Sequence, residues 1–351
     1  MKKTIAVLPG DGIGPEVIEQ AKNSLQTVAE KFGHTFIFKD GLIGAVAIDK
    51  KGNPYPIETH KLCLNSDAIL FGAIGDPQYD NNPIAKIRPE QGLLKMRKAL
   101  ALYANIRPIF TFKNLLAASP LKEEIIKGTD FIVIRELIGG IYFGKKGRNT
   151  VRTAAFDTSE YSQKEIEQVA KYAFQLAQKR KKRLTVVDKA NVLETSRLWR
   201  ETIQNMEKDY SDVTVTYMFV DNASMQIIKH PSEFDVIVTE NMFGDILTDE
   251  ASVITGSLGM LPSASIGKKT ALYEPIHGSY HKAAGQNTAN PIGAVLSAAM
   301  MLEYSFGLKR ERDAIYTAVE NVLNKGFGTK DLNPKTALGT KELGEKIKKA
   351  I

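Results

Sequence analysis

Five short, almost continuous apolar runs are spaced along the chain, and they constrain its fold more than any other feature. They cover residues 4–8, 68–72, 131–135, 184–187 and 236–239. Apolar runs of this length are typical of strands buried on both faces of a parallel sheet. The first run ends at Pro9 and precedes a helix that we expect over residues 15–32, with a proline in its first turn. Strands that alternate with helices predict an α/β fold with a largely parallel sheet.

The length of 351 residues exceeds one ordinary core, so we expect one large domain or two packed domains. No flexible linker is evident, which favours a substrate cleft between packed domains over a tethered pair. The longest nearly uncharged apolar run, 291–302, is too short to span a bilayer, and the apolar stretch at the amino terminus stops too early for a signal peptide. The single cysteine, Cys63, excludes an internal disulfide. We therefore expect a cytoplasmic protein without a membrane partner.

The net charge of +7 includes a dense basic run at residues 179–183. Nucleic-acid binding is one interpretation of such a run. The other is the end of an amphipathic helix, which Ser162 and Glu165 would begin as a capping box. Cations at the carboxyl end suit the helix dipole, and these helix signals favour the second interpretation. An anionic substrate would explain some of the remaining positive charge.

A carboxylate pair is the most distinctive chemical feature. If residues 241–250 (NMFGDILTDE) are helical, Asp245 and Asp249 lie four residues apart on one face. Two neighbouring carboxylates repel each other unless a cation lies between them, and oxygen ligands favour magnesium or manganese over zinc. A solvated acidic helix face explains the same spacing.

Three arginines, a lysine and a tyrosine could act on an anionic substrate. Arg97, Arg107 and Arg135 adjoin or interrupt apolar stretches. Guanidinium groups suit carboxylates, although an isolated arginine is more often a surface residue. Lys189 follows a predicted strand, where ligands commonly meet parallel sheets. Tyr142 could donate a proton or simply pack. The turn GDGIGPE at residues 10–16 could bind an anion, but it matches neither common nucleotide fingerprint, and a turn without a ligand explains it equally well.

These separate signals occur together in a fixed order. The segments cover residues 9–16, 135–144, 188–193, 241–250 and 273–279. In this order they resemble the isocitrate/isopropylmalate dehydrogenase family of β-hydroxyacid oxidative decarboxylases, from residue 3 to about residue 347. The resemblance implies an open-sheet α/β fold of two domains that is not a true Rossmann fold. Residues 1–102 and 256–351 would bind the cofactor. Residues 103–255 would bind substrate and metal and form the dimer, with a projecting arm near residues 139–158.

The resemblance also implies roles for the residues above. Arg97, Arg107 and Arg135 would clamp the carboxylates of a malate derivative. Tyr142 and Lys189 would be the catalytic residues for proton transfer. Asp245 and Asp249 would bind Mg²⁺ or Mn²⁺. The second subunit would supply Lys189 and a third acid, Asp221, which also faces the substrate, so the protein would be a homodimer with shared active sites.

Substrate choice is expected to depend on Leu93 and Leu94. In the isocitrate enzymes that this chain resembles, a serine or threonine at this place holds an extra carboxylate. The apolar wall of Leu93 and Leu94 suits an isopropyl group instead. We therefore expect oxidative decarboxylation of 3-isopropylmalate, as in leucine biosynthesis. Tartrate, methylmalate and homoisocitrate are the substrates of alternative family members. An inactive scaffold that binds nucleic acid is the alternative from another class, and the complete set of catalytic residues argues against it.

The resemblance implies a nicotinamide cofactor, held by residues from the two outer parts of the chain. They are Ile13, Glu274, His277, Gly278, Ser279, Lys282, Ala284 and Asn290. Lys282 stands where NAD-selective members usually have an aspartate, and a lysine would attract the 2′-phosphate of NADP. Ala283 stands where NADP-linked members usually add a tyrosine. One exposed cation contributes little, so NAD is favoured and NADP is the alternative.

Overall fold

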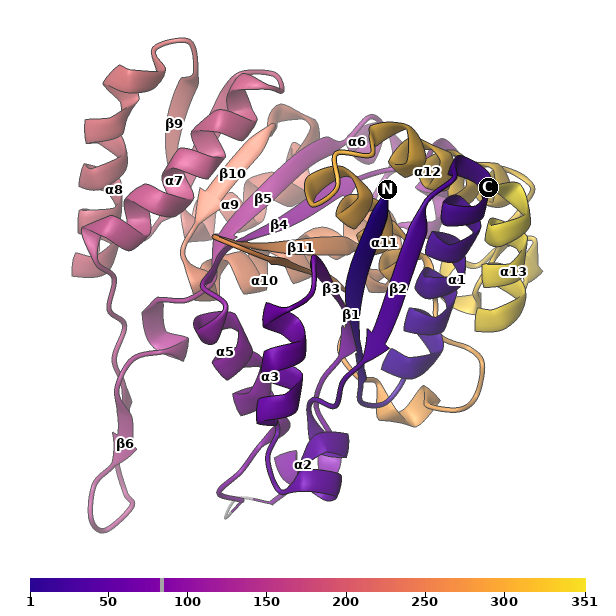
Figure 1. Ribbon diagram of the computed structural model, residues 1–351. Helices are drawn as coiled ribbons and strands as arrows, with labels where there is room; N and C mark the ends of the chain where they lie inside the picture. Colours follow the sequence, from indigo (N-terminus) through magenta and orange to yellow (C-terminus); the bar gives the residue numbers. More distant parts are fainter. Residues whose placement is uncertain (83–84) are drawn as a thin grey trace. The chain divides into compact units, whose positions relative to one another are not determined.

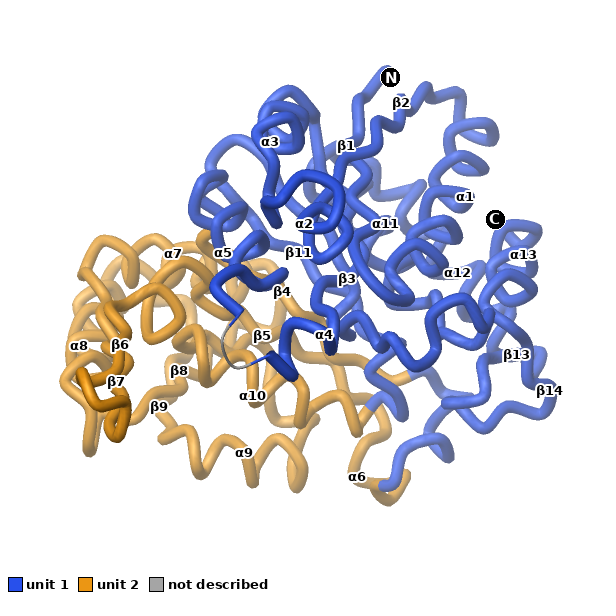
Figure 2. The backbone as a smooth tube through the Cα atoms, turned by 90° about the horizontal axis from the view of Figure 1, so that it is seen from below, with its two compact units in different colours: residues 1–102, 112–120, 255–351 blue, residues 103–111, 121–254 orange. Residues whose placement is uncertain are grey.

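The computed structural model describes residues 1–82 and 85–351, and these divide into two compact units (Figure 2). Unit 1 comprises residues 1–102, 112–120 and 255–351, and unit 2 comprises residues 103–111 and 121–254. The sequence-based boundaries placed 112–120 and residue 255 in the second domain, whereas the structure assigns them to unit 1. Each unit combines parallel strands with helices, as the apolar runs predict.

Unit 1 has five neighbouring strands, four of which are parallel. In spatial order they are β2 (Thr35–Asp40), β1 (Lys2–Gly10), β3 (Ala68–Ala73), β12 (Ala271–Pro275) and β11 (Pro262–Gly267). Only β11 runs antiparallel to its neighbour, β12. The predicted strands at residues 4–8 and 68–72 lie inside β1 and β3, and both pair in parallel as expected.

The helices of unit 1 surround one helix that is buried along most of its length. They are α1 (Gly14–Phe32), α2 (Ala45–Lys51), α3 (Ile57–Leu64), α4 (Pro77–Asp80), α5 (Pro89–Ala99), α11 (Ile292–Tyr304), α12 (Lys309–Asn324) and α13 (Thr340–Ala350). Residues 292–302 of α11 are all buried, and this helix packs against α1, α12 and β12. The longest apolar run of the sequence is therefore a core helix. Within residues 1–82 and 85–351, no helix is long and apolar enough to cross a membrane. Two short parallel strands, β13 (Phe327–Gly328) and β14 (Thr336–Ala337), complete the unit.

Unit 2 also has five neighbouring strands. They are β4 (Leu102–Phe110), β5 (Asp130–Glu136), β10 (Val236–Thr239), β8 (Arg183–Asp188) and β9 (Thr214–Phe219). All except β4 are parallel, so their carboxyl ends lie at one edge. The other three predicted strands fall within β5, β8 and β10. This edge is where the candidate site is built.

The helices of unit 2 include the amphipathic helix that the sequence predicts. They are α6 (Glu123–Ile126), α7 (Gln163–Gln178), α8 (Glu194–Glu207), α9 (Val220–Lys229) and α10 (Asn241–Ala251). Ser162 and Glu165 form the predicted capping box of α7, and its apolar face is buried. In the basic run that follows, Arg180 binds Asp130 at 2.9 Å and the buried Asp235 at 2.8 Å. Part of that positive charge is thus neutralised within the chain.

A hairpin lies within the segment expected to form an arm. Strands β6 (Lys146–Arg148) and β7 (Ala155–Asp157) pair antiparallel, and Figure 1 shows them extended beyond the helices of unit 2. Val151 and Phe156 expose apolar side chains on this hairpin. Residues of this kind are available for contact with another surface.

Candidate active site

One face of α10 carries a stripe of polar and small residues. It consists of Asn241, Gly244, Asp245, Thr248 and Asp249. Since α10 begins directly after β10, the stripe starts at the edge where the parallel strands of unit 2 end. The helix predicted for residues 241–250 is confirmed, and Asp245 and Asp249 share the face expected from their spacing.

Arg107, from β4, contacts both carboxylates of this stripe. Its side chain is almost fully buried, and its Nη atoms lie 3.4 Å from an oxygen of Asp245 and 3.7 Å from an oxygen of Asp249. The same guanidinium donates to the hydroxyl of Thr248 and, through Nε, to Asn105 Oδ1 at 2.6 Å. These bonds fix its orientation on the helix.

Arg135, from the end of β5, is the second guanidinium at the stripe. It is 2% exposed and forms an ion pair with Asp245. Its Nε and Nη2 atoms donate to Asn241 Oδ1 at 3.1 and 2.8 Å. A Cβ atom on Gly244 would lie 2.7 Å from Cβ and Cγ of Arg135. Glycine at this helix position therefore lets the stem of Arg135 cross α10 closely.

Tyr142 reaches the same carboxylate from the loop after β5. Its hydroxyl donates to Asp245 Oδ2 at 3.1 Å, and its ring lies 5.7 Å from the guanidinium carbon of Arg135. Desolvation raises the pKa of Tyr142, and the charge of Asp245 adds to this shift. A tyrosine is protonated at neutral pH even at its ordinary pKa, so this phenol has a proton to donate.

The carboxylates suit a hard cation, but one chain supplies only part of a site. Desolvation raises the pKa of Asp249; Arg107 opposes the shift, and the Asp245 carboxylate adds to it. Within the described ranges, no three His, Cys, Asp or Glu side chains are grouped closely enough to hold a metal ion. Oxygen ligands alone fit Mg²⁺ or Mn²⁺, which need further ligands from another source.

A second group of predicted residues lies at the ends of β8 and β9. Lys189 Nζ contacts Asp221 Oδ1 at 2.8 Å, and this bond lowers the pKa of Asp221. The preceding Asp188 is fully buried and accepts two 2.9 Å hydrogen bonds from Arg200. The structure therefore brings Lys189, which is half-buried, and Asp221, which is exposed, together as one ion pair.

The remaining predicted substrate residues belong to α5 in unit 1. Arg97 is buried and binds Glu274 at 3.0 Å, while its Nε atom has no hydrogen-bond partner in the described part of the chain. Leu93 and Leu94 are half-buried and precede Arg97 by about one helical turn. Arg97, predicted to bind the substrate, therefore contacts Glu274, which was predicted to bind the cofactor.

The predicted cofactor residues form two loops of unit 1. The N–H of Ile13 donates to the carbonyl of Ser279 at 2.8 Å, and a Cβ on Gly12 would lie 2.0 Å from that same oxygen. Glycine is therefore required where these loops touch. The turn at residues 10–16 also has a structural role, because buried Asp11 accepts backbone N–H groups from Ala45, Val46 and Gly75.

His277 is the clearest candidate for contact with a nucleotide. Desolvation lowers its pKa, and its Nε2 atom is buried without a hydrogen-bond partner among the described residues. A bound heterocycle could satisfy this atom. Asn290 offers less, since its side chain accepts the N–H of Ile292 at 3.0 Å and donates to Asp331 at 3.1 Å.

The loop after His277 leaves several predicted residues accessible. Gly278 and Lys282 are exposed, and Ser279 and Ala284 are half-buried. Lys282 forms no ion pair with any described residue, so its ammonium group can meet a ligand.

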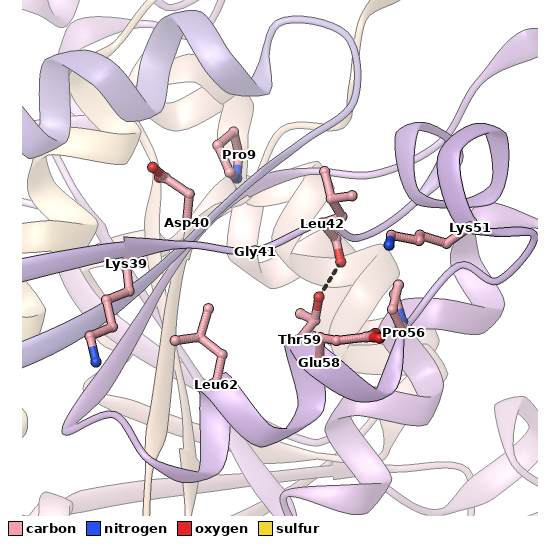
Figure 3. Close-up of a pocket in the computed structure, with 10 residues that line it drawn as sticks. All are labelled: Pro9, Lys39, Asp40, Gly41, Leu42, Lys51, Pro56, Glu58, Thr59 and Leu62. Atoms are coloured by element: carbon pink, nitrogen blue, oxygen red, sulfur yellow. Dashed lines mark hydrogen bonds between the residues drawn. The ribbon is translucent and has the colours of Figure 1, made fainter.

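A pocket of about 540 Å³ lies elsewhere in unit 1, near the carboxyl ends of β1 and β2 (Figure 3). Leu42, Leu62 and Pro56 line it together with charged side chains such as Lys39 and Glu58. The ten lining residues include none of the predicted catalytic, metal, substrate or cofactor residues. The pocket therefore does not identify the site.

Sequence reasoning missed three members of the stripe on α10: Asn241, Gly244 and Thr248. They recur with the two aspartates at spacings of three and four residues, which is the period of one helix face. A glycine inside a predicted helix was a further available signal, because its cost requires a packing reason.

The α/β units, with buried guanidinium groups that meet carboxylates near strand ends, suit the binding of a small anionic molecule. A family model described as isocitrate/isopropylmalate dehydrogenase matches residues 4–347, and the chain belongs to this family. Enzymes of this family use a nicotinamide cofactor and require a divalent metal ion. The resemblance inferred from the five ordered segments is therefore confirmed.

Curated relatives and solved structures agree with this assignment. The chain is 54% identical to 3-isopropylmalate dehydrogenase of Geobacillus kaustophilus, with 99% of this chain and 95% of the relative covered. It is 53% identical to the enzyme of the same name from Bacillus subtilis, with 100% and 98% covered. A crystal structure of isocitrate dehydrogenase from Methylococcus capsulatus is 31% identical, with a TM-score of 0.90 and 99% of both chains covered.

Proposed function

We propose that this dehydrogenase converts 3-isopropylmalate to 4-methyl-2-oxopentanoate and carbon dioxide, with NAD as the hydride acceptor, in leucine biosynthesis. One observation carries the proposal: relatives named for 3-isopropylmalate are 52–56% identical across nearly the whole chain. The half-buried pair of Leu93 and Leu94, one turn from Arg97, supports an apolar branch on the substrate.

Substrate binding follows from the guanidinium groups. Arg107 and Arg135 are buried and held by neutral partners as well as by Asp245, so they present fixed donors to substrate carboxylates. The family resemblance assigns a third substrate contact to Arg97 of unit 1, whose Nε atom has no hydrogen-bond partner in the described part of the chain. Because these guanidinium groups are buried and oriented before the substrate binds, they favour a doubly charged substrate over a neutral analogue.

Asp245 and Asp249 would hold the divalent cation, together with Asp221 of a second subunit. The oxygen-only donor set of α10 supports Mg²⁺ or Mn²⁺. When bound, such an ion stabilises negative charge on the substrate oxygens. When bound, NAD accepts the hydride from C2 of the substrate.

Two side chains of this protein would then move the protons. Lys189, acting through water, takes the proton of the C2 hydroxyl as the hydride leaves. The resulting β-keto acid loses its C3 carboxyl group as carbon dioxide, and the buried guanidinium groups stabilise the enolate. Tyr142, whose hydroxyl donates to Asp245 at 3.1 Å, protonates C3 and releases the 2-oxo acid.

A homodimer with shared sites would bring Lys189 and Asp221 to the partner's carboxylates. Exposed apolar side chains on α9, α10 and the hairpin support such an interface, among them Met225, Ile246 and Phe156. A Lys189→Met protein mixed with an Asp245→Asn protein should regain activity, because one site in each hybrid dimer is intact. Mixtures as inactive as their parents would exclude shared sites.

Turnover of a substrate panel tests the proposal. NADH formation should be fastest with 3-isopropylmalate, and slower with isocitrate, homoisocitrate, methylmalate and tartrate, at saturating Mg²⁺. A higher kcat/KM for isocitrate would refute the substrate assignment. The same assay with NADP tests the cofactor, since Lys282 is the feature that favours a 2′-phosphate.

A further inference from the structure

Asn241 joins three parts of the candidate site: α10, Arg135 and the loop at Gly139. No role was predicted for it from the sequence. It is the first residue of α10 and is 1% exposed. Its Oδ1 atom accepts two hydrogen bonds from Arg135, at 3.1 and 2.8 Å. Its Nδ2 atom donates to the carbonyl of Gly139 at 3.0 Å. One buried amide thus binds both the substrate-facing arginine and the loop that follows it.

The loop that Asn241 holds leads directly to Tyr142. Glu136 accepts the N–H of Gly139 at 2.9 Å, so Gly139 is fixed through its N–H by Glu136 and through its carbonyl by Asn241. Tyr142 ends the short helix of residues 140–142, and its hydroxyl meets Asp245 four residues along α10 from Asn241. Asn241 is therefore linked to both ends of the Tyr142–Asp245 contact: to Tyr142 through the Gly139 loop, and to Asp245 through α10.

We propose that Asn241 is a positioning residue for the proposed reaction, holding Arg135 for the substrate carboxylate and the Gly139 loop for proton delivery by Tyr142. An asparagine suits both tasks because its acceptor and donors stand on one rigid group. Aspartate would keep the acceptor for Arg135 and turn an oxygen toward the Gly139 carbonyl. Alanine would remove both contacts.

The two substitutions should separate the two tasks. Asn241→Asp should keep KM for 3-isopropylmalate within about threefold while kcat falls at least about tenfold, because only the loop is released. Asn241→Ala should raise KM and lower kcat together, with a loss in kcat/KM of about 10- to 100-fold, as expected for buried hydrogen bonds to a charged group. The control is Ser297→Ala in unit 1, which removes a buried hydroxyl that accepts the N–H of Ser263 at 3.2 Å and donates to the carbonyl of Gly293 at 2.7 Å. It should lower Tm but change neither constant by more than about twofold.

This inference rests on the proposed function for its kinetic arm, and a second arm is independent of it. Crystal structures of the wild type and Asn241→Ala should differ in the Arg135 guanidinium and in the Gly139 carbonyl. If both groups kept their places, or if both variants matched the kinetics of Ser297→Ala, Asn241 would have only a structural role. A wild type that fails to turn over 3-isopropylmalate would refute the proposed function, while the crystal structures would still decide the role of Asn241.

Discussion

The close crossing of Arg135 over α10 predicts an unusual result for Gly244→Ala. Replacing a glycine inside a helix by alanine normally stabilises a protein by about 1 kcal/mol. Here the added methyl group would lie 2.7 Å from both Cβ and Cγ of Arg135. Those atoms belong to the stem of a side chain that is 2% exposed and bound to Asn241 and Asp245, so they cannot turn aside freely.

The magnitude follows from the displacement that the overlap requires. Ordinary contact between carbon atoms begins at about 3.5 Å, so the helix or the Arg135 stem must move by just under 1 Å. Overpacking of this kind costs about 1–3 kcal/mol, which cancels or reverses the helix gain. A misplacement near 1 Å at a positioned catalytic group can reduce the rate about 100-fold. We therefore expect a change in Tm of only a few degrees, with a loss in kcat/KM of roughly 10- to 100-fold.

The assay compares Gly244→Ala with Gly344→Ala, which makes the same change in α13 of unit 1. There the added methyl would meet the flexible end of Gln20, 2.2 Å from its Oε1 atom. Gly344→Ala should have wild-type kcat and KM whatever its Tm. If Gly244→Ala also had wild-type kinetics, the close packing of Arg135 on α10 would not position it for the reaction.

Three further predictions follow from the described contacts. Burial raises the pKa of Glu240 to about 7. Above pH 4.5 the folded state therefore binds more protons than the unfolded state. The free energy of unfolding should thus fall by up to roughly 3 kcal/mol as the pH rises to 7. Glu240→Gln, which keeps an acceptor for the Ser196 hydroxyl, should match the wild type in Tm at pH 5 and exceed it at pH 8, and parallel Tm curves would contradict this. Tyr142→Phe should lower kcat by about 100- to 10,000-fold with an unchanged Tm, and an unchanged rate would remove Tyr142 from proton delivery. Lys282→Asp should raise the ratio of kcat/KM for NAD to that for NADP, because it exchanges an exposed cation for a group that repels the 2′-phosphate, and a constant ratio would show that this position does not select the cofactor.

The strands that sequence reasoning found are those with uninterrupted apolar runs, such as β3 and β10, which are buried at every residue. Strands β4 and β9 escaped because polar residues interrupt them: Asn105 and Arg107 in β4, and Thr216 in β9. Arg107 is buried only because α10 supplies partners from a distant part of the sequence. Local patterns cannot reveal such compensation.

The same limit explains what was missed in the site. The spacing of Asp245 and Asp249 and the types of Arg107, Arg135 and Tyr142 were readable from the sequence, and the structure brings these five together. The link between Arg97 and Glu274, and the role of Asn241, depend on contacts between residues more than a hundred positions apart. No short-range period encodes such pairs.

We propose that the carboxylates of α10 bind a divalent cation that this dehydrogenase needs to oxidise 3-isopropylmalate. The most direct measurement is the initial rate of NADH formation by the wild type and by Asp245→Asn, first with a chelator and then across a Mg²⁺ titration. We predict no wild-type rate with chelator, full recovery with Mg²⁺, and no recovery of Asp245→Asn at concentrations that saturate the wild type. A wild-type rate that is indifferent to chelation, or an Asp245→Asn protein with normal Mg²⁺ dependence, would contradict the claim.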